Sequence, residues 1–358
     1  MLKERIKKLR KIFQQSGLDL FLTDDFANRY YLSGLESSAG WLLISLNSAY
    51  LLVDSRYFEK AKKEVSDFFE VIEVEDFFKA TARICETQKI KRVGFESHNL
   101  THQKLVRLKS ALRGKKLVGT IGLVEDLRSQ KDESEVTLIL RSIRVAEIAF
   151  KNILNLIKPG VSEAELAWEL EKKMRDLGAE KVAWQPLLIA VGENSALPHY
   201  GHGKHKIKNG DIVQFDFGAV VGGYYSDISR VVFVGKPSVR QKQIYNLVLE
   251  AQRQAIDLVK DGAVGGRIDG KVKEFLRKKT DGVFRHSLGH GVGLEIHELP
   301  RLYVGSKEKL QSGNVITIEP GIYLPGWGGV RIEDMVLITK DGCKVLTKLP
   351  KKIEEVTV

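Results

Sequence analysis

The sequence contains only two cysteines, Cys85 and Cys343, which lie far apart and outside any metal-ligand spacing. This usage gives no support for a disulfide framework or a thiolate metal site, and it requires no oxidising compartment. Long apolar runs are also missing, since stretches such as Trp41 to Ile44 fall far short of the ~20 residues of a membrane span. The first residues, MLKERIKKLRKIF, lack the apolar core of a signal peptide and space their apolar residues as a helix does. We therefore expect a cytoplasmic protein without membrane association.

Basic residues exceed acidic ones, with 57 lysines and arginines against 46 aspartates and glutamates and a formal net charge of +11. This excess raises the question of nucleic acid. The basic residues are scattered in short runs, however, and no aromatic-interleaved basic motif accompanies them. Scattered charge of this kind is typical of a solvated surface. We expect no nucleic-acid partner.

A chain of 358 residues is long for one hydrophobic core, so two domains are expected. The first part alternates short apolar strands with helices, which predicts an α/β domain over residues 1–125. Its predicted strands lie near residues 19–22, 40–44, 50–53, 71–74 and 93–95, and its predicted helices near 1–13, 57–63 and 101–112. The second domain is predicted over residues 126–358, beginning with a long helix from about Glu133 to Ile157 that Pro159 and Gly160 end.

Helical signals continue in the second domain. Ser162 and Glu165 have the spacing of a capping box, which predicts the start of a further helix that ends at Leu177 and Gly178. Two more helices are predicted over about 238–259 and 267–279. They separate two strand-rich blocks.

The two blocks are an internal repeat. The segment Asn209 to Gly218, NGDIVQFDFG, aligns without a gap with Ser312 to Gly321, SGNVITIEPG. Each segment joins an apolar strand to a carboxylate and a second glycine. A glycine-containing turn and a returning strand with another carboxylate follow each one. We infer a pseudo-twofold domain whose four acids converge at the centre.

The four acids are Asp216 and Asp227 in the first block and Glu319 and Glu333 in the second. Two carboxylates on adjacent strands repel each other unless a cation or a proton lies between them. Sequence does not fix whether Asp216 and Asp227 are directly opposite or diagonal, and one carboxylate of a pair can instead face solvent. The flanking apolar residues predict burial, and buried acids need partners. Arg331 can neutralise one acid, so a divalent metal is the simplest partner for the remainder.

A histidine-rich segment follows the second pair of helices. His286, His290 and His297 lie close together in the sequence, and glycines at 289, 291 and 293 allow the backbone to approach its neighbours closely. Four carboxylates with one imidazole suit Mn²⁺ or Co²⁺, with Zn²⁺ or Fe²⁺ also possible. Two such ions would offset the acidic charge and lower the pKa of water toward neutrality. The pattern therefore predicts a hydrolase, and no serine or cysteine nucleophile motif competes with it.

These residues resemble a known family. The run GDIVQFDFGAVVGGYYSDISR, followed by GHGVGLEIHELP, ITIEPGIY and GVRIEDMVLIT, is similar to the pita-bread metallopeptidases, in the group of Xaa-Pro aminopeptidases and prolidases. The resemblance covers about residues 126–358. The first 125 residues resemble the creatinase-type N-terminal domain of the same proteins, through Asn28 to Gly34 and Leu52 to Tyr57. The fold implied is α/β (α+β), a creatinase-like domain followed by a pseudo-twofold pita-bread catalytic domain.

The resemblance also implies roles for single residues. Asp216 would hold one ion, His290 and Glu319 the other, and Asp227 and Glu333 would bridge both. Glu319 would in addition handle protons during the reaction. The remaining implied roles are a scissile-carbonyl contact for His199, stabilisation of the tetrahedral intermediate for His297, a proline subsite for His286, and supporting positions for Arg331 and Tyr323. Ser229 stands where the family more often has threonine, and its hydroxyl is retained.

The implied activity is release of the N-terminal residue from short peptides with proline in second position, that is, an Xaa-Pro aminopeptidase. An Xaa-Pro dipeptidase (prolidase) is the alternative, and a non-catalytic peptide- or partner-binding relative is a remote one. Arg331 and the N-terminal domain argue against a methionine aminopeptidase, and the intact ligand set argues against a creatinase. A homodimer is expected from the family. The native metal and the choice between aminopeptidase and dipeptidase stay open at this level.

Overall fold

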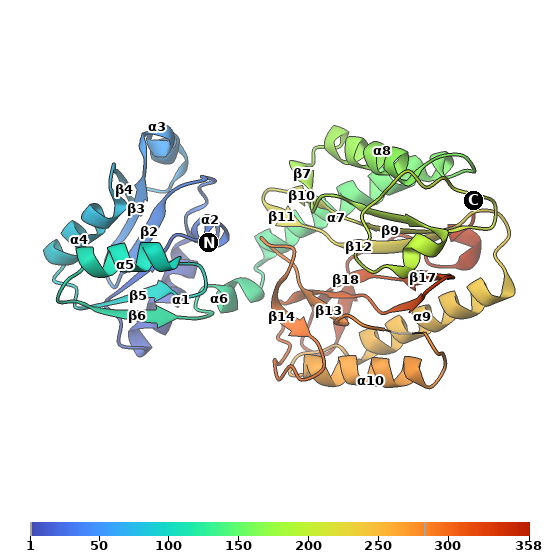
Figure 1. Cartoon of the computed structure of the whole chain (residues 1–358). Coiled ribbons are helices and arrows are strands. Elements are labelled where there is room, and N and C mark those ends of the chain that lie inside the picture. Colours follow the sequence, from blue (N-terminus) through green and yellow to red (C-terminus); the bar gives the residue numbers. More distant parts are fainter. Residues whose placement is uncertain (1, 283) are drawn as a thin grey trace. The chain divides into compact units, whose positions relative to one another are not determined.

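A computed structural model describes residues 2–282 and 284–358. The chain forms two compact units, of which the first ends at Arg128 and the second begins at Ser129. Both units appear in Figure 1, and each is described by itself. No helix among the described residues is long and apolar enough to cross a membrane.

The first unit is a six-stranded sheet with helices, in the strand order β4-β3-β2-β1-β5-β6. Only β2 runs antiparallel to its neighbours, so the other strands end at one common edge of the sheet. The strands are β1 (Leu20–Thr23), β2 (Trp41–Ser45), β3 (Ala49–Val53), β4 (Glu70–Glu73), β5 (Arg92–Glu96) and β6 (Lys116–Thr120). The helices are α1 (Leu2–Gln15), α2 (Phe26–Ser33), α3 (Ser55–Glu64), α4 (Phe77–Thr87), α5 (His102–Ala111) and α6 (Glu125–Ser129).

The expected α/β class of this unit is confirmed, but α2, α4 and β6 were not expected from sequence. Both helices carry local signals: the side chain of Asp25 caps α2, and that of Asp76 caps α4. Gly34 ends α2 in the left-handed conformation at φ 77°. Strand β6 lies at the edge of the sheet and is only partly buried. Its sequence therefore lacks the apolar alternation that marks a half-buried strand.

The second unit repeats one order of elements twice, as the sequence repeat predicts. Each half has two helices, then two strands, then a group of four strands. The first half contains α7 (Glu133–Ile153), α8 (Glu163–Asp176), β7 (Lys181–Val182), β8 (Leu188–Val191), β9 (Ile212–Phe217), β10 (Ala219–Val221), β11 (Tyr224–Tyr225) and β12 (Ile228–Phe233). The second half contains α9 (Val239–Leu258), α10 (Gly265–Arg277), β13 (Gly289–Gly291), β14 (Glu298–Leu302), β15 (Val315–Ile318), β16 (Gly321–Leu324), β17 (Gly328–Arg331) and β18 (Asp334–Ile338), followed by β19 (Cys343–Val345).

The helix boundaries follow local signals in the sequence. The capping box at the start of α8 is confirmed: Ser162 accepts a hydrogen bond from the Glu165 amide, and the Glu165 carboxylate accepts one from the Ser162 amide. Helix α7 is shorter than predicted, because the chain continues from Leu154 to Leu156 as a 3₁₀ turn. Such tightening is common in the last turn of a helix.

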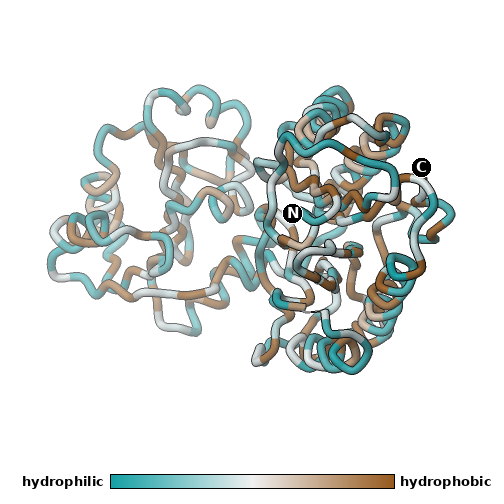
Figure 2. The backbone as a smooth tube through the Cα atoms, turned by 45° about the vertical axis from the view of Figure 1, so that its right-hand side comes forward, coloured by the Kyte–Doolittle hydropathy of each residue, from teal (hydrophilic) through white to brown (hydrophobic). Residues whose placement is uncertain are grey.

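Helices and strands of the second unit pack through one large apolar core. Residues of α9 and α10 such as Tyr245, Val248 and Ile268 pack there with Ile316 and Val336 from the central strands. In the hydropathy colouring of Figure 2, the helices carry both hydrophilic and hydrophobic residues within their turns. This is the pattern of helices that bury one face against a sheet. The core fixes the two hairpins that carry the predicted acids.

The first unit also buries an acid, Glu96, at the end of β5. The amide of Asn28 donates hydrogen bonds to Glu96 at 2.6 Å and to Glu125 at 2.7 Å, and the Thr23 hydroxyl donates to the other oxygen of Glu96. Burial raises the pKa of Glu96 to about 8, and the charge of Glu125 acts in the same direction. Glu96 is therefore protonated in the folded protein at pH values where an exposed glutamate is ionised.

This shift predicts a pH-dependent effect of Glu96→Gln. An unfolded glutamate loses its proton near about pH 4, whereas folded Glu96 keeps its proton up to a pKa of about 8. The folded state then binds more protons between these values, so the free energy of unfolding falls as pH rises through this window. Glutamine cannot ionise. From about pH 5 to about pH 9, the free energy of unfolding of the variant should therefore rise by more than about 1.4 kcal/mol relative to that of the wild type.

Calorimetric unfolding at the two pH values measures this difference. Glu70→Gln, on the exposed face of β4, is the control. Its free energy of unfolding should differ from that of the wild type by the same amount at both pH values. An effect of Glu96→Gln that does not change with pH would contradict the burial argument.

Candidate active site

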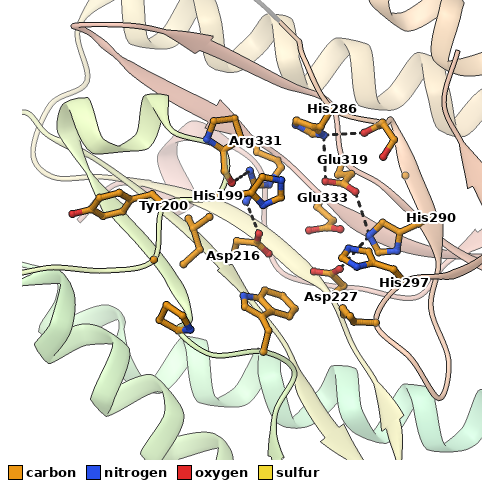
Figure 3. A pocket seen from close by; sticks show the side chains of 18 of the residues that line it. His199, Tyr200, Asp216, Asp227, His286, His290, His297, Glu319, Arg331 and Glu333 are labelled. Carbon is orange, nitrogen blue, oxygen red and sulfur yellow. Dashed lines mark hydrogen bonds and ion pairs between the residues drawn. The ribbon is translucent and has the colours of Figure 1, made fainter. Parts of the chain in front are cut away.

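Four carboxylates from the two repeats meet in one cavity of the second unit. Asp216 lies on β9 and Asp227 directly precedes β12, while Glu319 follows β15 and Glu333 directly precedes β18. Figure 3 shows their carboxylates facing a common space. The cavity has a volume of about 770 Å³ and is also lined by predicted site residues His199, His286, His290, His297 and Arg331. Tyr323, the remaining predicted residue, contacts His286 and Arg331.

The register of the first hairpin settles the relation between the two aspartates. Asp216 is paired with Ser229 across β9 and β12, and Phe217 with Ile228. Asp227 therefore lies beyond the last pair, and the two aspartates are diagonal rather than directly opposite. Ser229, in the position opposite Asp216, directs its hydroxyl to Arg331. This arrangement was left open by the sequence.

His290 reaches the carboxylates from β13, whose glycines permit close packing. A Cβ atom on Gly289 would lie 2.0 Å from the Thr317 carbonyl oxygen, and one on Gly291 would lie 2.1 Å from that of Leu299. This confirms that the glycines serve close backbone approach. The Nδ1 atom of His290 lies 3.1 Å from the Gly291 carbonyl oxygen. With Nδ1–H donating to this carbonyl, Nε2 faces the acids.

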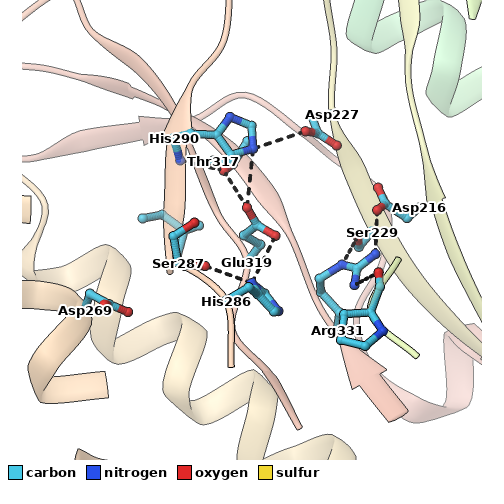
Figure 4. Close-up of polar contacts among 12 residues, drawn as sticks. Asp216, Asp227, Ser229, Asp269, His286, Ser287, His290, Thr317, Glu319 and Arg331 are labelled. Carbon is cyan, nitrogen blue, oxygen red and sulfur yellow. Dashed lines mark hydrogen bonds and ion pairs between the residues drawn. The ribbon is translucent and has the colours of Figure 1, made fainter. Parts of the chain in front are cut away.

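The Nε2 atom of His290 lies 3.5 Å from Asp227 Oδ2 and 3.4 Å from Glu319 Oε1 (Figure 4). Burial alone would lower the pKa of His290, but the carboxylates of Glu319 and Asp227 raise it to about 9. Burial would conversely raise the pKa of Glu319, but the hydrogen bond with His290, and then the neighbouring His286, His290 and Arg331, lower it to about 2. The Thr317 hydroxyl, on β15 two residues before Glu319, accepts a hydrogen bond from the His290 amide at 3.1 Å. The imidazole and the two acids are thus held as one unit.

Arg331 is the buried cation of the site. Its guanidinium donates to Asp216 and, at 2.8 Å, to the Ser229 hydroxyl (Figure 4). The Tyr323 hydroxyl accepts a further hydrogen bond from it at 2.8 Å. It also donates to the Pro198 carbonyl, next to His199 in the sequence. Arg331 therefore orients one of the four acids and the segment that carries His199. Among the residues that the structure describes, Asp216 is the acid with which it pairs, which agrees with the expectation that one arginine cannot neutralise four carboxylates.

Two further histidines line the cavity as neutral groups. Burial lowers the pKa of His286 to about 4. Its Nδ1 lies 2.8 Å from the Ser287 carbonyl oxygen, so Nε2 accepts the Tyr323 hydroxyl at 2.8 Å. Partial burial, and then the neighbouring His290, lower the pKa of His297 to about 4. The rings of His290 and His297 lie 4.3 Å apart between centroids. Ser287 and Tyr323 thus occupy both ring nitrogens of His286, whereas a neutral His297 keeps an N–H for hydrogen bonding to substrate at neutral pH.

The cavity fits divalent metal ions on its own chemistry. Asp216 Oδ1 and Glu333 Oε1 are buried and have no hydrogen-bond partner in the described part of the chain. Burial, and then the neighbouring acids, raise the pKa values of Asp227 and Glu333 well above their ordinary range. One ligand atom each from Asp227, His290 and Glu333 lie within 4.8 Å of one another. Buried acids that repel one another and keep free oxygen atoms are a donor set for a hard divalent cation.

Some residues of the cavity wall were not expected from sequence. Trp184, Tyr200, Ile296, Arg301 and Tyr303 line it beside the predicted set. Arg301 lies on β14, and the register with β13 places it opposite His290. Trp184 lies in a loop next to β7, where no pattern in the sequence indicates which residues face the site.

The comparisons with known proteins agree with this geometry. Residues 137–340 match the model of metallopeptidase family M24, and residues 5–130 match that of the creatinase/prolidase N-terminal domain. The chain belongs to metallopeptidase family M24. The expected creatinase-like domain followed by a pita-bread catalytic domain is thereby confirmed, and so is the expectation of a hydrolase.

Several relatives of this M24 chain are similar over their full length. The chain is similar to a structure described as Xaa-Pro dipeptidase from Bacillus anthracis, at 39% identity with a TM-score of 0.95 and 100% of both chains covered. It is also similar to X-Pro aminopeptidase from Thermotoga maritima, at 39% identity with a TM-score of 0.89, covering 96% of this chain and 98% of that one. Xaa-Pro dipeptidase of Pyrococcus horikoshii is 38% identical over 99% of both proteins.

The donor set predicts metal binding that can be measured without activity. Protein stripped by a chelator should bind two Mn²⁺ per chain in isothermal titration calorimetry, as a two-metal hydrolase site does. Its melting temperature should rise with Mn²⁺ concentration, because the ions bind only the folded state. Glu333→Gln should bind fewer ions, whereas Glu250→Gln on α9, the exposed control, should bind as the wild type does. Unaltered stoichiometry in Glu333→Gln would remove Glu333 from the donor set.

Proposed function

We propose that this M24 metallopeptidase hydrolyses Xaa-Pro bonds in short peptides and releases the N-terminal residue, as an Xaa-Pro aminopeptidase does. The observation that carries the proposal is the convergence of four buried carboxylates with His290, beside two neutral histidines, in one cavity. Relatives of both names, X-Pro aminopeptidase and Xaa-Pro dipeptidase, support the proline-containing substrate class. A homodimer and a cytoplasmic location remain expectations.

Asp216, Asp227, His290, Glu319 and Glu333 would hold two divalent ions. When bound, the ions would neutralise the acids, polarise the scissile carbonyl and lower the pKa of water. Oxygen donors with one imidazole favour Mn²⁺ or Co²⁺, and they also accept Zn²⁺ or Fe²⁺.

The remaining roles fall to side chains around the acids. Glu319 would take a proton from the attacking water and pass it to the leaving nitrogen, since its carboxylate is ionised and close to His290. His297 would donate a hydrogen bond to the oxygen on which negative charge develops. His199 would contact the scissile carbonyl. Arg331 would keep Asp216 ionised and aligned, because its guanidinium donates directly to that carboxylate.

The preference for proline rests on the family, and the proposed chemistry is compatible with it. An Xaa-Pro bond has no N–H, and its ring fixes φ. An enzyme that must hydrogen-bond this N–H cannot use such a bond. In the proposed site the bound ions and His199 would contact the carbonyl instead. His286 and Tyr323 would line the space for the proline ring.

The experiment that tests the proposal is release of alanine from Ala-Pro-Ala and from Ala-Pro. The protein is stripped by chelator and reloaded with Mn²⁺ or Co²⁺ before the assay. We expect cleavage of the tripeptide at least as fast as that of the dipeptide. Activity on neither peptide, with metal bound, would contradict the proposed function and favour a binding protein.

The dipeptidase is a second candidate, and Arg301 favours it. Its guanidinium is near enough to His297 to lower the pKa of that imidazole, and it lines the cavity. A cation there can pair with the carboxylate of a C-terminal proline. If the dipeptidase is correct, Ala-Pro is cleaved and Ala-Pro-Ala is not, and Arg301→Ala raises KM for Ala-Pro with little change in kcat.

Two histidine variants separate metal binding from catalysis. His290→Ala should abolish turnover and weaken one metal site, because its Nε2 faces two of the proposed ligands. His297→Ala should lower kcat ~10²–10³-fold with the metal content unchanged, as loss of a preorganised donor does. Steady-state kinetics and metal analysis give both quantities, and His205→Ala, an exposed histidine, serves as control. Loss of metal in His297→Ala would show that its role was wrongly assigned.

A further inference from the structure

A second set of buried charges lies behind Glu333, on the side away from the cavity. Arg230 on β12 and Asp334 on β18 are 1% and 0% exposed. Arg230 Nη2 lies 2.7 Å from Asp334 Oδ1. The pair therefore ties a strand of the first repeat to a strand of the second. Neither residue lines the cavity among the residues that the structure describes.

Arg230 also holds the main chain on both sides of the acids. Its Nη1 donates to the Ser229 carbonyl at 2.9 Å and to the Glu333 carbonyl. The Glu333 amide in turn donates to the Ser229 carbonyl at 3.2 Å. Both main-chain polar groups of Glu333 are thus fixed to β12, the strand that follows Asp227. The position of the Glu333 side chain depends on these bonds.

Asp334 connects this pair to the C-terminal segment. It accepts hydrogen bonds from the Thr347 hydroxyl at 2.6 Å and from Lys351 Nζ. Arg230 Nη2 donates to the Leu349 carbonyl at 3.1 Å. Two cations therefore share one buried carboxylate, and both of its oxygen atoms accept hydrogen bonds. Burial would raise the pKa of Asp334, but Arg230 and Lys351 lower it, so it stays ionised.

Lys351 connects Asp334 to helix α9 and, through that helix, to the main chain next to Glu333 and Glu319. Its Nζ donates to Gln252 Oε1 at 3.0 Å. Gln252 Nε2 donates to the Ile332 carbonyl at 3.1 Å and to the Ile318 carbonyl at 3.3 Å. These carbonyls directly precede Glu333 and Glu319. A continuous line of polar contacts, Gln252–Lys351–Asp334–Arg230, thus fixes the main chain beside two of the four acids.

We propose that Gln252, Lys351, Asp334 and Arg230, here called the buried polar chain, are positioning residues that set the affinity of the carboxylate cluster for divalent ions. The inference rests on the proposed metal-dependent function. Lys351 and Asp334 act through Glu333 and Glu319 without touching ion or substrate. The C-terminal segment 347–351 is therefore part of the device that preorganises the site. Partners that orient ligands from behind typically change metal affinity by ~10–100-fold when removed.

Lys351→Met tests the proposal, because Lys351 is partly exposed and its loss leaves the Arg230–Asp334 pair in place. Mn²⁺ affinity of the stripped full-length protein is measured by calorimetry, and the visible spectrum of the Co²⁺-loaded protein reports ligand geometry. We expect ~10-fold or more weaker Mn²⁺ binding and an altered Co²⁺ spectrum. Lys351→Arg should restore both in large part. Lys352→Met, which removes an exposed lysine at the next position, should bind as the wild type does.

Thr347→Val gives a second, milder variant that removes one hydrogen bond to Asp334, and it should weaken Mn²⁺ binding in the same direction. If both variants melt at lower temperature but keep wild-type Mn²⁺ affinity and Co²⁺ spectrum, the chain only stabilises the fold and the proposal is wrong. An equal loss in Lys352→Met would also overturn it, since net charge would then be the cause. These outcomes concern metal binding alone. Failure to cleave Xaa-Pro peptides would therefore reject the proposed function but would not decide whether the buried polar chain sets metal affinity.

Discussion

The mutual repulsion of four carboxylates in one buried cavity is the constraint on which the rest of this structure depends. Asp216 has a guanidinium beside it, whereas Asp227 and Glu333 have their pKa values raised well above the ordinary range by burial and then by neighbouring acids. Such a cluster is unfavourable unless cations join it, because isolated buried charge is costly. The site is therefore incomplete as protein alone. With divalent ions bound, the donor set, the neutral histidines and the arginine would form one site for hydrolysis.

The duplicated fold is what brings these acids together. Each half supplies one hairpin with two carboxylates, and the helices of each half lie outside and bury the apolar faces of the strands. The halves are not equivalent in chemistry, because only the second supplies His290 and Arg331. Arg230 and Gln214 link the halves: the Gln214 side chain accepts from the Arg331 amide at 2.7 Å, on the strand of the opposite repeat. Buried polar contacts of this kind fix the register between the halves.

The sequence predicts the site better than its surroundings. The gapless repeat of residues 209–218 in 312–321 carries the period-2 alternation of strands, so both hairpins and their acids could be predicted. The register of the first hairpin could not be predicted, because a diagonal and a direct pairing of Asp216 and Asp227 give the same alternation of apolar and polar residues. The presence of Arg301 and Trp184 in the cavity wall could not be predicted either, since they reach the cavity through tertiary packing. Arg230 and Asp334 read as ordinary charged residues near strands, and only the structure shows that they face each other in the interior.

The central claim is that the acids are held together by two bound ions, and anomalous diffraction from crystals of the Mn²⁺-loaded protein tests it most directly. The account predicts two anomalous peaks ~3.5–4 Å apart, bordered by Asp216, Asp227, His290, Glu319 and Glu333. A single peak, or peaks only outside this cavity, would contradict it.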